Sequence, residues 1–268
     1  MRKTIALVRA GFLTAASYRL SIVVSFATLA FQAVPTFYIG HILQPFMGPS
    51  IQSEGKDYFG FLLVGTVAYL FLAAAVDALP RALDTGISTG TLEALFTTPT
   101  PLSVLLAGLT GHELIMTTLK AGVFLIVGSA LGARVAWSHL PAASLIILLI
   151  VLAYYPVGVL AGALIVAFRR AGPLQTVVVV LSGLLGGVSY SMSMEQVPSW
   201  IQRLSTFVPL TYGLRALRRV LLEGRPLADV ASDVVRLAGL ALALFIVGSY
   251  CFSLALHHAR RSGSLAQY

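Results

Sequence analysis

Few side chains in this sequence have the types and spacing that catalysis or metal binding requires. The five histidines are scattered, and only His257 and His258 are adjacent. His112-Glu113 has no second histidine four residues after the first, so it lacks the zinc-binding pattern of a metalloprotease helix. Cys251 is the only cysteine, so neither an intrachain disulfide nor a cysteine cluster is possible. The sequence therefore predicts no catalytic residue, no metal site and no cofactor in this chain.

A loop that could hold a nucleotide is also missing from the sequence. The only Gly-Lys pair, Gly55-Lys56, is followed by Asp57 and not by the serine or threonine of a P-loop. The net charge is +8, but the basic residues flank apolar segments, where they meet anionic lipid headgroups. We therefore expect membrane lipids and not nucleic acid as partners.

Hydroxyl and amide side chains instead recur at helical spacing in two apolar segments. Such stripes avoid lipid, so they either line a path for a transported molecule or pack helices through hydrogen bonds of about 1 kcal/mol. Both interpretations stay open. The first stripe consists of Ser21, Ser25, Thr28, Gln32 and Thr36. The second consists of Gln175, Ser182, Gly186, Ser189 and Ser193.

The composition indicates the elements that carry these stripes. Hydrophobic residues make up 57% of the chain and charged residues 10%, too few charges for a soluble surface. Long apolar runs without alternation indicate helices, and a span needs about 20 residues. We expect one all-α membrane domain over 1–268, with a helix on the membrane surface or a frayed tail at 1–19. The six expected spans are 20–43, 58–80, 108–132, 142–168, 174–193 and 234–256.

The break at 194–233 contains two short apolar pieces that meet at Pro209. Neither piece is long enough to cross a membrane. They are either two half-helices dipping into one leaflet or an amphipathic helix on the surface, with Trp200, Tyr212 and arginines such as Arg215 at the headgroup level. Because short loops and both termini are basic on one side, we place the N-terminus in the cytosol and this break outside.

Charged residues inside the expected spans are few. Asp77 and Arg81 stand four residues apart, which predicts a local ion pair. Glu113 and Lys120 are too few to form a proton relay. Pairs of glycines at 128/132 and 158/162 predict close helix packing.

The most specific local feature lies in the break at 81–101. Gly90 can act as an N-cap, and Glu93 then lies near the positive end of a short helix that Pro99 ends. A short amphipathic helix between two spans suits docking into a groove of a soluble partner. Its expected docking residues are Gly90, Thr91, Leu92, Glu93, Leu95 and Phe96.

Two segments of the chain resemble a known family. Gly90-Thr-Leu-Glu-Ala-Leu-Phe-Thr-Thr-Pro99 is similar to the segment after the second span in membrane subunits of type-2 ATP-binding-cassette exporters. Pro209-Leu-Thr-Tyr-Gly-Leu-Arg-Ala-Leu-Arg218 resembles the stretch before their last span. The size and the six-span layout agree along nearly the whole chain, but the short loop at 44–57 leaves no room for a folded extracellular domain.

The resemblance implies a permease subunit that is driven by ATP hydrolysis in another subunit. The helix at 90–97 would be the coupling helix on a separate ATPase subunit, which would bind the ATP and Mg²⁺. The pieces at 196–222 would be outer re-entrant helices. A second permease copy or a homologue would complete a path lined mainly by the first and fifth spans.

The expected function is therefore efflux of an amphipathic or hydrophobic molecule, such as a drug-like compound or a lipid, through the plasma (inner) membrane of a prokaryote, with both termini cytosolic. A permease for a lipid-linked glycan and an ion-coupled secondary carrier are the alternatives.

Overall fold

A computed structural model describes residues 19–51, 54–55, 57–90, 102–168, 174–192 and 197–261, and every regular element in these ranges is a helix. The predicted all-α class is confirmed there, whereas the expected surface helix at 1–19 lies almost wholly outside the described residues. The α-helices are α2 (Arg19–Met47), α3 (Tyr58–Ser88), α5 (Leu102–Ala130), α6 (Leu140–Phe168), α7 (Leu174–Gly186), α8 (Ser199–Ser205), α9 (Pro209–Leu222) and α10 (Ala231–Arg261). Three short 3-10 helices join them, η1 (Gly48–Ile51), η2 (Trp137–His139) and η3 (Leu227–Val230).

Five helices in the described ranges are long and apolar enough to cross a membrane, namely α2, α3, α5, α6 and α10. The sixth expected span, 174–193, coincides with α7, which has 13 residues. At 1.5 Å per residue α7 is about 20 Å long, shorter than the roughly 30 Å hydrocarbon core. Gly187 follows it with a φ of 75°, a left-handed conformation that ends helices and favours glycine.

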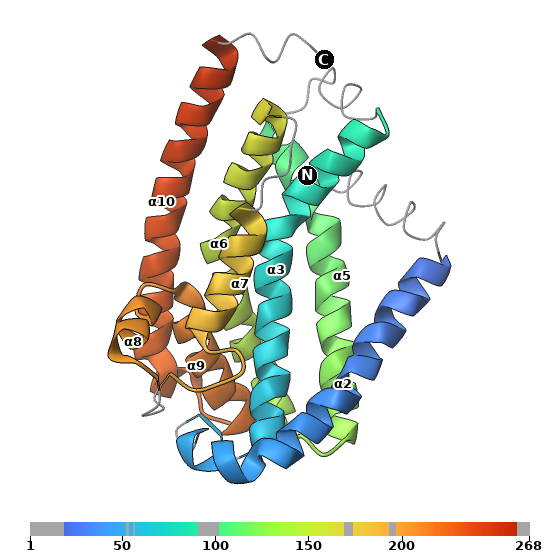
Figure 1. The fold of residues 1–268 in the computed structure, drawn as a ribbon, viewed down its shortest axis with the longest axis vertical. Helices are drawn as coiled ribbons and strands as arrows, with labels where there is room; N and C mark the ends of the chain where they lie inside the picture. Colours follow the sequence, from blue (N-terminus) through green and yellow to red (C-terminus); the bar gives the residue numbers. More distant parts are fainter. Residues whose placement is uncertain are drawn as a thin grey trace.

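Helix α3 forms the centre of the bundle. It packs against α2, α5, α6, α7 and α9, and 78% of its apolar span is buried. Figure 1 shows α3 between α7 on one side and α5 and α2 on the other. By contrast, 11% of the span in α2 is buried, so most of this helix faces away from its own chain.

Helix α3 is also longer than expected. The sequence predicted a break from residue 81, but the helix continues through Pro80 to Ser88. Asp57 caps its first turn, since its carboxylate accepts hydrogen bonds from the amides of Phe59 and Gly60. The predicted ion pair between Asp77 and Arg81 is confirmed at 2.7 Å.

Glycines allow α6 to approach α3. A Cβ on Gly158 would lie 2.5 Å from the carbonyl oxygen of Ala75, and one on Gly162 would lie 3.0 Å from side-chain atoms of Leu79. This pair therefore packs helices, as predicted. In the other pair Gly128 fits against Leu63, whereas Gly132 has no such neighbour and adopts a φ of 112° in the turn after α5.

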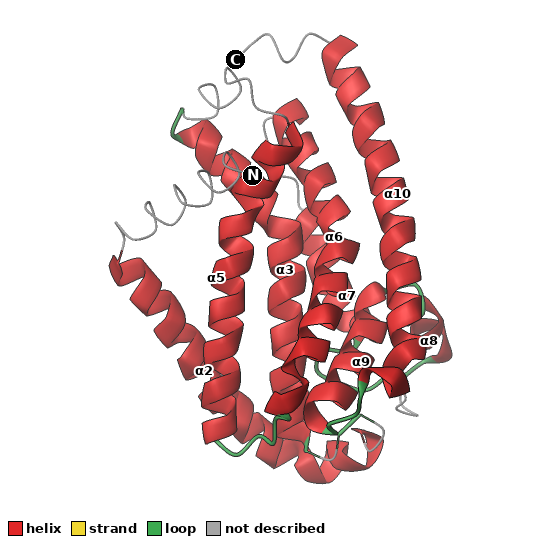
Figure 2. Ribbon diagram, turned by 180° about the vertical axis from the view of Figure 1, so that it is seen from behind, coloured by secondary structure: helices red, strands yellow, loops and turns green. Residues whose placement is uncertain are grey.

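The connections gather at two ends of the bundle, as Figure 2 shows. One end holds the α2–α3 turn, the α5–α6 link, α8 and α9; we call it the α9 end. The amide of Ala136 in the α5–α6 link donates to the carbonyl of Leu221 in α9 over 2.7 Å. The described part of α3 ends at the opposite end, together with that of α10 (Figure 1). The sequence analysis placed the links at 44–57, 133–141 and 194–233 on the same side of the membrane. In the structure, the described parts of all three lie at the α9 end.

Candidate functional site

The expected coupling segment lies almost wholly outside the described residues. Thr91, Leu92, Glu93, Leu95 and Phe96 are in the undescribed range 91–101, so their docking role stays a prediction. Gly90 is described. It is exposed, and it follows α3 with a φ of 68° and its amide bonded to the carbonyl of Ile87. The central helix α3 therefore leads directly into this segment.

The polar stripe on α2 is not covered by the rest of the chain. Thr28 and Gln32 are exposed, and Ser25 and Thr36 are half-buried; the side chain of Ser21 is not described. The hydroxyl of Thr28 donates to the carbonyl of Val24 in its own helix, and that of Thr36 donates to the carbonyl of Gln32 in the same way, both over 2.8 Å. The stripe is therefore available to a second chain or to a transported molecule.

The polar stripe on α7 lies differently. Ser182 is 8% exposed and lies against Tyr154 of α6, and a Cβ on Gly186 would be 2.8 Å from Leu210 of α9. Gln175 is half-buried, and Ser189 lies beyond the end of the helix, where it is exposed. The Ser182 part of this stripe therefore packs against other helices. The exposed face of α7 is aliphatic apart from Thr176, and its large side chains are Val177, Val180, Leu181 and Leu184.

The two stripes do not meet within one chain. Helix α2 packs against α3 and α5, whereas α7 packs against α3, α6, α8 and α9. Since α3 separates them (Figure 1), a path lined by both α2 and α7 requires a second permease chain.

The segment 196–222 forms two short helices that meet near Pro209. Helix α8 is exposed on one side, where Trp200 is 61% and Leu204 46% exposed. Helix α9 is buried between α3, α6, α7 and α10, so it is not a helix lying on the surface. Its interior face consists of Leu210, Leu214, Leu217 and Leu221.

The sequence analysis expected the arginines of this segment at the headgroup level. In the structure, not all arginines of α9 lie at the surface. Arg215 and Arg219 are about one quarter exposed and flank the carboxylate of Asp233, at 3.6 Å and 3.5 Å. Arg218, in contrast, is 1% exposed. Its residue type suggested solvent, but its position four residues after Leu214 and three before Leu221 places it on the interior face of the helix. This spacing was the available signal.

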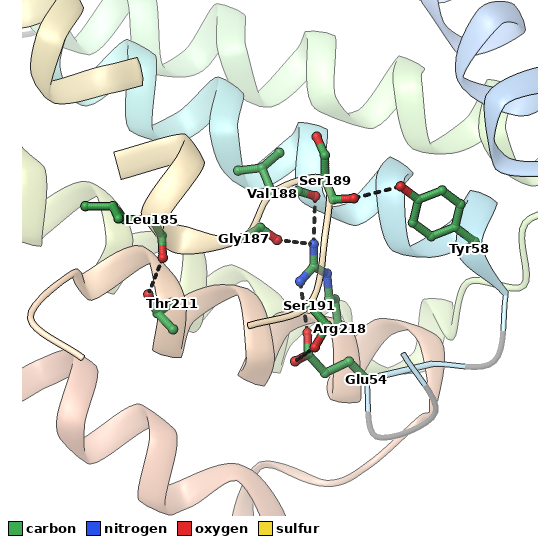
Figure 3. Close-up of polar contacts among 9 residues, drawn as sticks. All are labelled: Glu54, Tyr58, Leu185, Gly187, Val188, Ser189, Ser191, Thr211 and Arg218. Atoms are coloured by element: carbon green, nitrogen blue, oxygen red, sulfur yellow. Dashed lines mark hydrogen bonds and ion pairs between the residues drawn. The ribbon is translucent and has the colours of Figure 1, made fainter. Parts of the chain in front are cut away.

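The guanidinium group of Arg218 is the centre of a buried polar network (Figure 3). Nη1 donates to the Glu54 carboxylate over 2.9 Å, and Nη2 donates to the carbonyls of Gly187 and Val188 over 3.0 and 2.8 Å. The guanidinium carbon lies 3.3 Å from the centre of the Phe61 ring, a cation–π contact. Arg218 thereby joins α9, α3, the α2–α3 turn and the end of α7.

The charges of this pair compensate each other in a desolvated site. Burial lowers the pKa of Arg218 to about 10, although Glu54 acts in the opposite direction. The guanidinium therefore still carries its proton at neutral pH. The carbonyls of Gly187 and Val188 follow the last turn of α7, where a positive charge is favourable to the helix dipole.

Two neighbouring contacts hold the same segment. The hydroxyl of Tyr58 donates to the carbonyl of Ser189 over 2.7 Å, and that of Ser191 donates to the second carboxylate oxygen of Glu54 over 3.2 Å. A Cβ on Gly65 would collide with the carbonyl of Val188, so this backbone lies directly on α3. The sequence analysis did not predict this network.

A cavity of about 720 Å³ also opens at the α9 end. Its charged lining contains both signs, and two of the lining residues, Arg225 and Glu223, form an ion pair. Such a lining suits water or small polar solutes better than an apolar cargo. In the described ranges, no three histidine, cysteine or acidic side chains gather as metal ligands.

The comparison with known protein families decides the class of the chain. Residues 3–222 match the family described as ABC-2 type transporter. The chain belongs to the ABC-2 type transporter family. It is a multi-pass membrane protein and the permease component of its transporter, not the ATPase itself, and the family implies an ABC ATPase subunit as partner. No curated protein matches the chain.

Proposed function

We propose that this ABC-2 permease exports an amphipathic or hydrophobic molecule, such as a drug-like compound or a lipid, from a prokaryotic cell across its inner membrane, driven by ATP. Family membership carries this proposal, because a permease without a nucleotide site of its own needs energy from an ATPase subunit. In this arrangement the α9 end faces outward, and both chain termini and the segment at 90–97 face the cytosol.

The position of α3 supports the coupling role of that segment. Among the described long helices it packs against α2, α5 and α6, and it ends at Ser88, three residues before Thr91. A displacement of the 90–97 segment by the ATPase would therefore act directly on the central helix. Two permease chains would then enclose the path between α2 of one chain and α7 of the other.

The nature of the cargo follows from the exposed faces of these two helices. Helix α2 presents the hydroxyl of Thr28 and the amide of Gln32, and α7 presents the aliphatic face that contains Val177 and Leu184. Neither face carries a fixed charge. Such a lining favours a molecule with a large apolar part and a few hydrogen-bonding groups over an ion.

Replacing Glu93 by alanine tests the coupling role. The permease is purified together with a candidate ABC ATPase subunit, and assembly and ATP hydrolysis are measured in lipid nanodiscs. We expect Glu93→Ala to weaken binding of the ATPase to the permease by roughly thirtyfold or more, since truncating a charged contact in a desolvated interface costs about 2–5 kcal/mol.

Asp84→Ala is the matched control, because Asp84 is an exposed acid at the same end of the bundle, on α3 just before the segment. Its assembly should equal that of the unmodified chain. Equal assembly and ATP hydrolysis for both variants would contradict the coupling role, and transport that continues without ATP but stops with the proton gradient would contradict the proposed class.

A further inference from the structure

The segment after α7 is held in place by side chains from other elements. Residues 187, 188, 189 and 191 each make a hydrogen bond to a side chain of α9, of α3 or of the α2–α3 turn. In Figure 3, Arg218 and Tyr58 approach this segment from different helices, and Glu54 lies below Arg218. Three parts of the chain are therefore joined at one point.

Stability alone does not explain a buried ion pair at this point. The side chains of Arg218 and Glu54 are 2% and 6% exposed, so both have lost most of their hydration. A desolvated pair contributes little more than well-packed apolar side chains would, whereas losing one partner leaves a buried charge. The pair instead fixes the relative orientation of the elements around it, because a planar guanidinium with three acceptors permits only one placement of the groups that bind it.

The same point lies at one end of the central helix. Helix α3 starts at Tyr58 in the network and has 31 residues, so it is about 46 Å long. Its other end leads to the segment at 90–97. A displacement of that segment would therefore be transmitted to the network through α3 alone.

We propose that Arg218 and Glu54 are positioning residues that make α9, residues 187–191 and the start of α3 move as one rigid body during transport. This inference rests on the proposed function and deepens it. The pair does not contact the cargo. It acts through α7, whose last turn it fixes to the body that α3 moves, so that the end of the path opens only when α3 is displaced.

Glu54→Gln tests this role with little change of shape. Glutamine retains an oxygen that accepts the bond from Arg218, but it leaves the guanidinium without a counter-charge. Glu223→Gln is the matched control, since Glu223 also pairs with an arginine at the α9 end but is partly exposed. Cys251→Ser removes the only native cysteine and permits site-directed labelling.

Spin labels at two exposed positions, Ser189 in residues 187–191 and Ala228 in η3, which packs against α9, then report whether residues 187–191 and α9 stay fixed to one another. Their distance is measured in the permease alone, in the nucleotide-free complex and in the complex trapped with ATP and vanadate. In the unmodified chain and in Glu223→Gln we expect one narrow distance that is the same in all states. In Glu54→Gln we expect the distribution to split into two distances upon trapping, with assembly preserved.

Two results would overturn the proposal. One is a mean distance in the unmodified chain that changes between the nucleotide-free and trapped complexes. The other is a Glu54→Gln distribution that stays single and narrow in every state, as a purely structural staple predicts. If Glu54→Gln does not fold, the unmodified chain still decides between a rigid and a flexible body. Failure of the proposed function is recognised separately, because no complex with the ATPase then forms.

Discussion

Arg218 and Ser182 show how far residue type and location diverge in this chain. An arginine in an amphipathic segment is normally expected in water, and a serine in a polar stripe next to a path. Here the arginine is buried in the protein, and the serine lies against Tyr154. The two side chains thus contribute to packing at the junctions of α6, α7 and α9.

The buried position of Ser182 changes what a bulky replacement there would measure. We expect Ser182→Phe to lower the yield of folded protein, since overpacking a tight core costs about 1–3 kcal/mol. Ser25→Phe on the half-buried stripe of α2 should leave folding intact but reduce transport. Size-exclusion profiles and uptake of a fluorescent lipid analogue into inverted vesicles check both. Full transport by Ser25→Phe would show that the α2 stripe lines no path.

The sequence predicted which polar residues share a helical face, but not which neighbouring elements each face packs against. Periodicity reports which side chains share a helical face, and it gave Ser182 and Gly186 one face correctly. It does not report what that face meets. The polar face of α7 packs against α6 and α9 because α9 folds back into the bundle, and nothing within residues 174–193 carries that information.

At the scale of elements, α9 differs most from a surface helix. Its leucines fill a space between α3, α6, α7 and α10, while one side of the neighbouring helix α8 is exposed. Arg218 could be placed inside only once α9 itself is placed inside. The pairing of Glu54 with it depends on the fold as a whole, because the α2–α3 turn carries no apolar pattern that predicts its partner.

Leucine-to-alanine substitutions separate the contributions of α8 and α9. Leu214 is fully buried, so Leu214→Ala should lower the free energy of unfolding by about 2–5 kcal/mol through lost contacts and a cavity. Leu204 in α8 is 46% exposed, and Leu204→Ala should change it by less than about 0.5 kcal/mol. Unfolding in detergent, followed by tryptophan fluorescence, compares the two. Equal losses would mean that α9 is not part of the core.

The helix bounds show what an apolar pattern determines well. The long spans were predicted because lipid requires continuous apolar runs, and α3, α6 and α10 occur where those runs are. Helix ends were less predictable. Pro80 and the polar residues from Arg81 onward suggested a break in α3, yet the helix continues to Ser88, since a proline in a long helix removes only one backbone hydrogen bond.

At the scale of the whole molecule, α2 has the smallest buried share among the five long helices of the described residues. Phe31 is 73% exposed on it, beside the exposed amide of Gln32. Lipid covers phenylalanine readily, but an amide in hydrocarbon lacks hydrogen-bond partners. A second permease chain would provide a better environment for this mixed face.

We therefore expect Phe31→Cys, in the Cys251→Ser background, to form a covalent dimer with a short bismaleimide in native membranes. Leu242→Cys on α10 is the control, because Leu242 is similarly exposed but its helical neighbours Gly239, Phe245 and Ile246 have no polar side chain. Denaturing gels show the result. Dimers from Leu242→Cys alone would place the interface on α10 and would contradict the path between α2 and α7.

The separation of Glu54 and Arg218 along the chain has a consequence for biogenesis. The two residues are 164 positions apart. When the first four long helices have been synthesised and inserted into the membrane, Glu54 is present but Arg218 has not yet been synthesised. The early helices cannot adopt their final arrangement at this end until α9 arrives, so the last third of translation completes what the first third began.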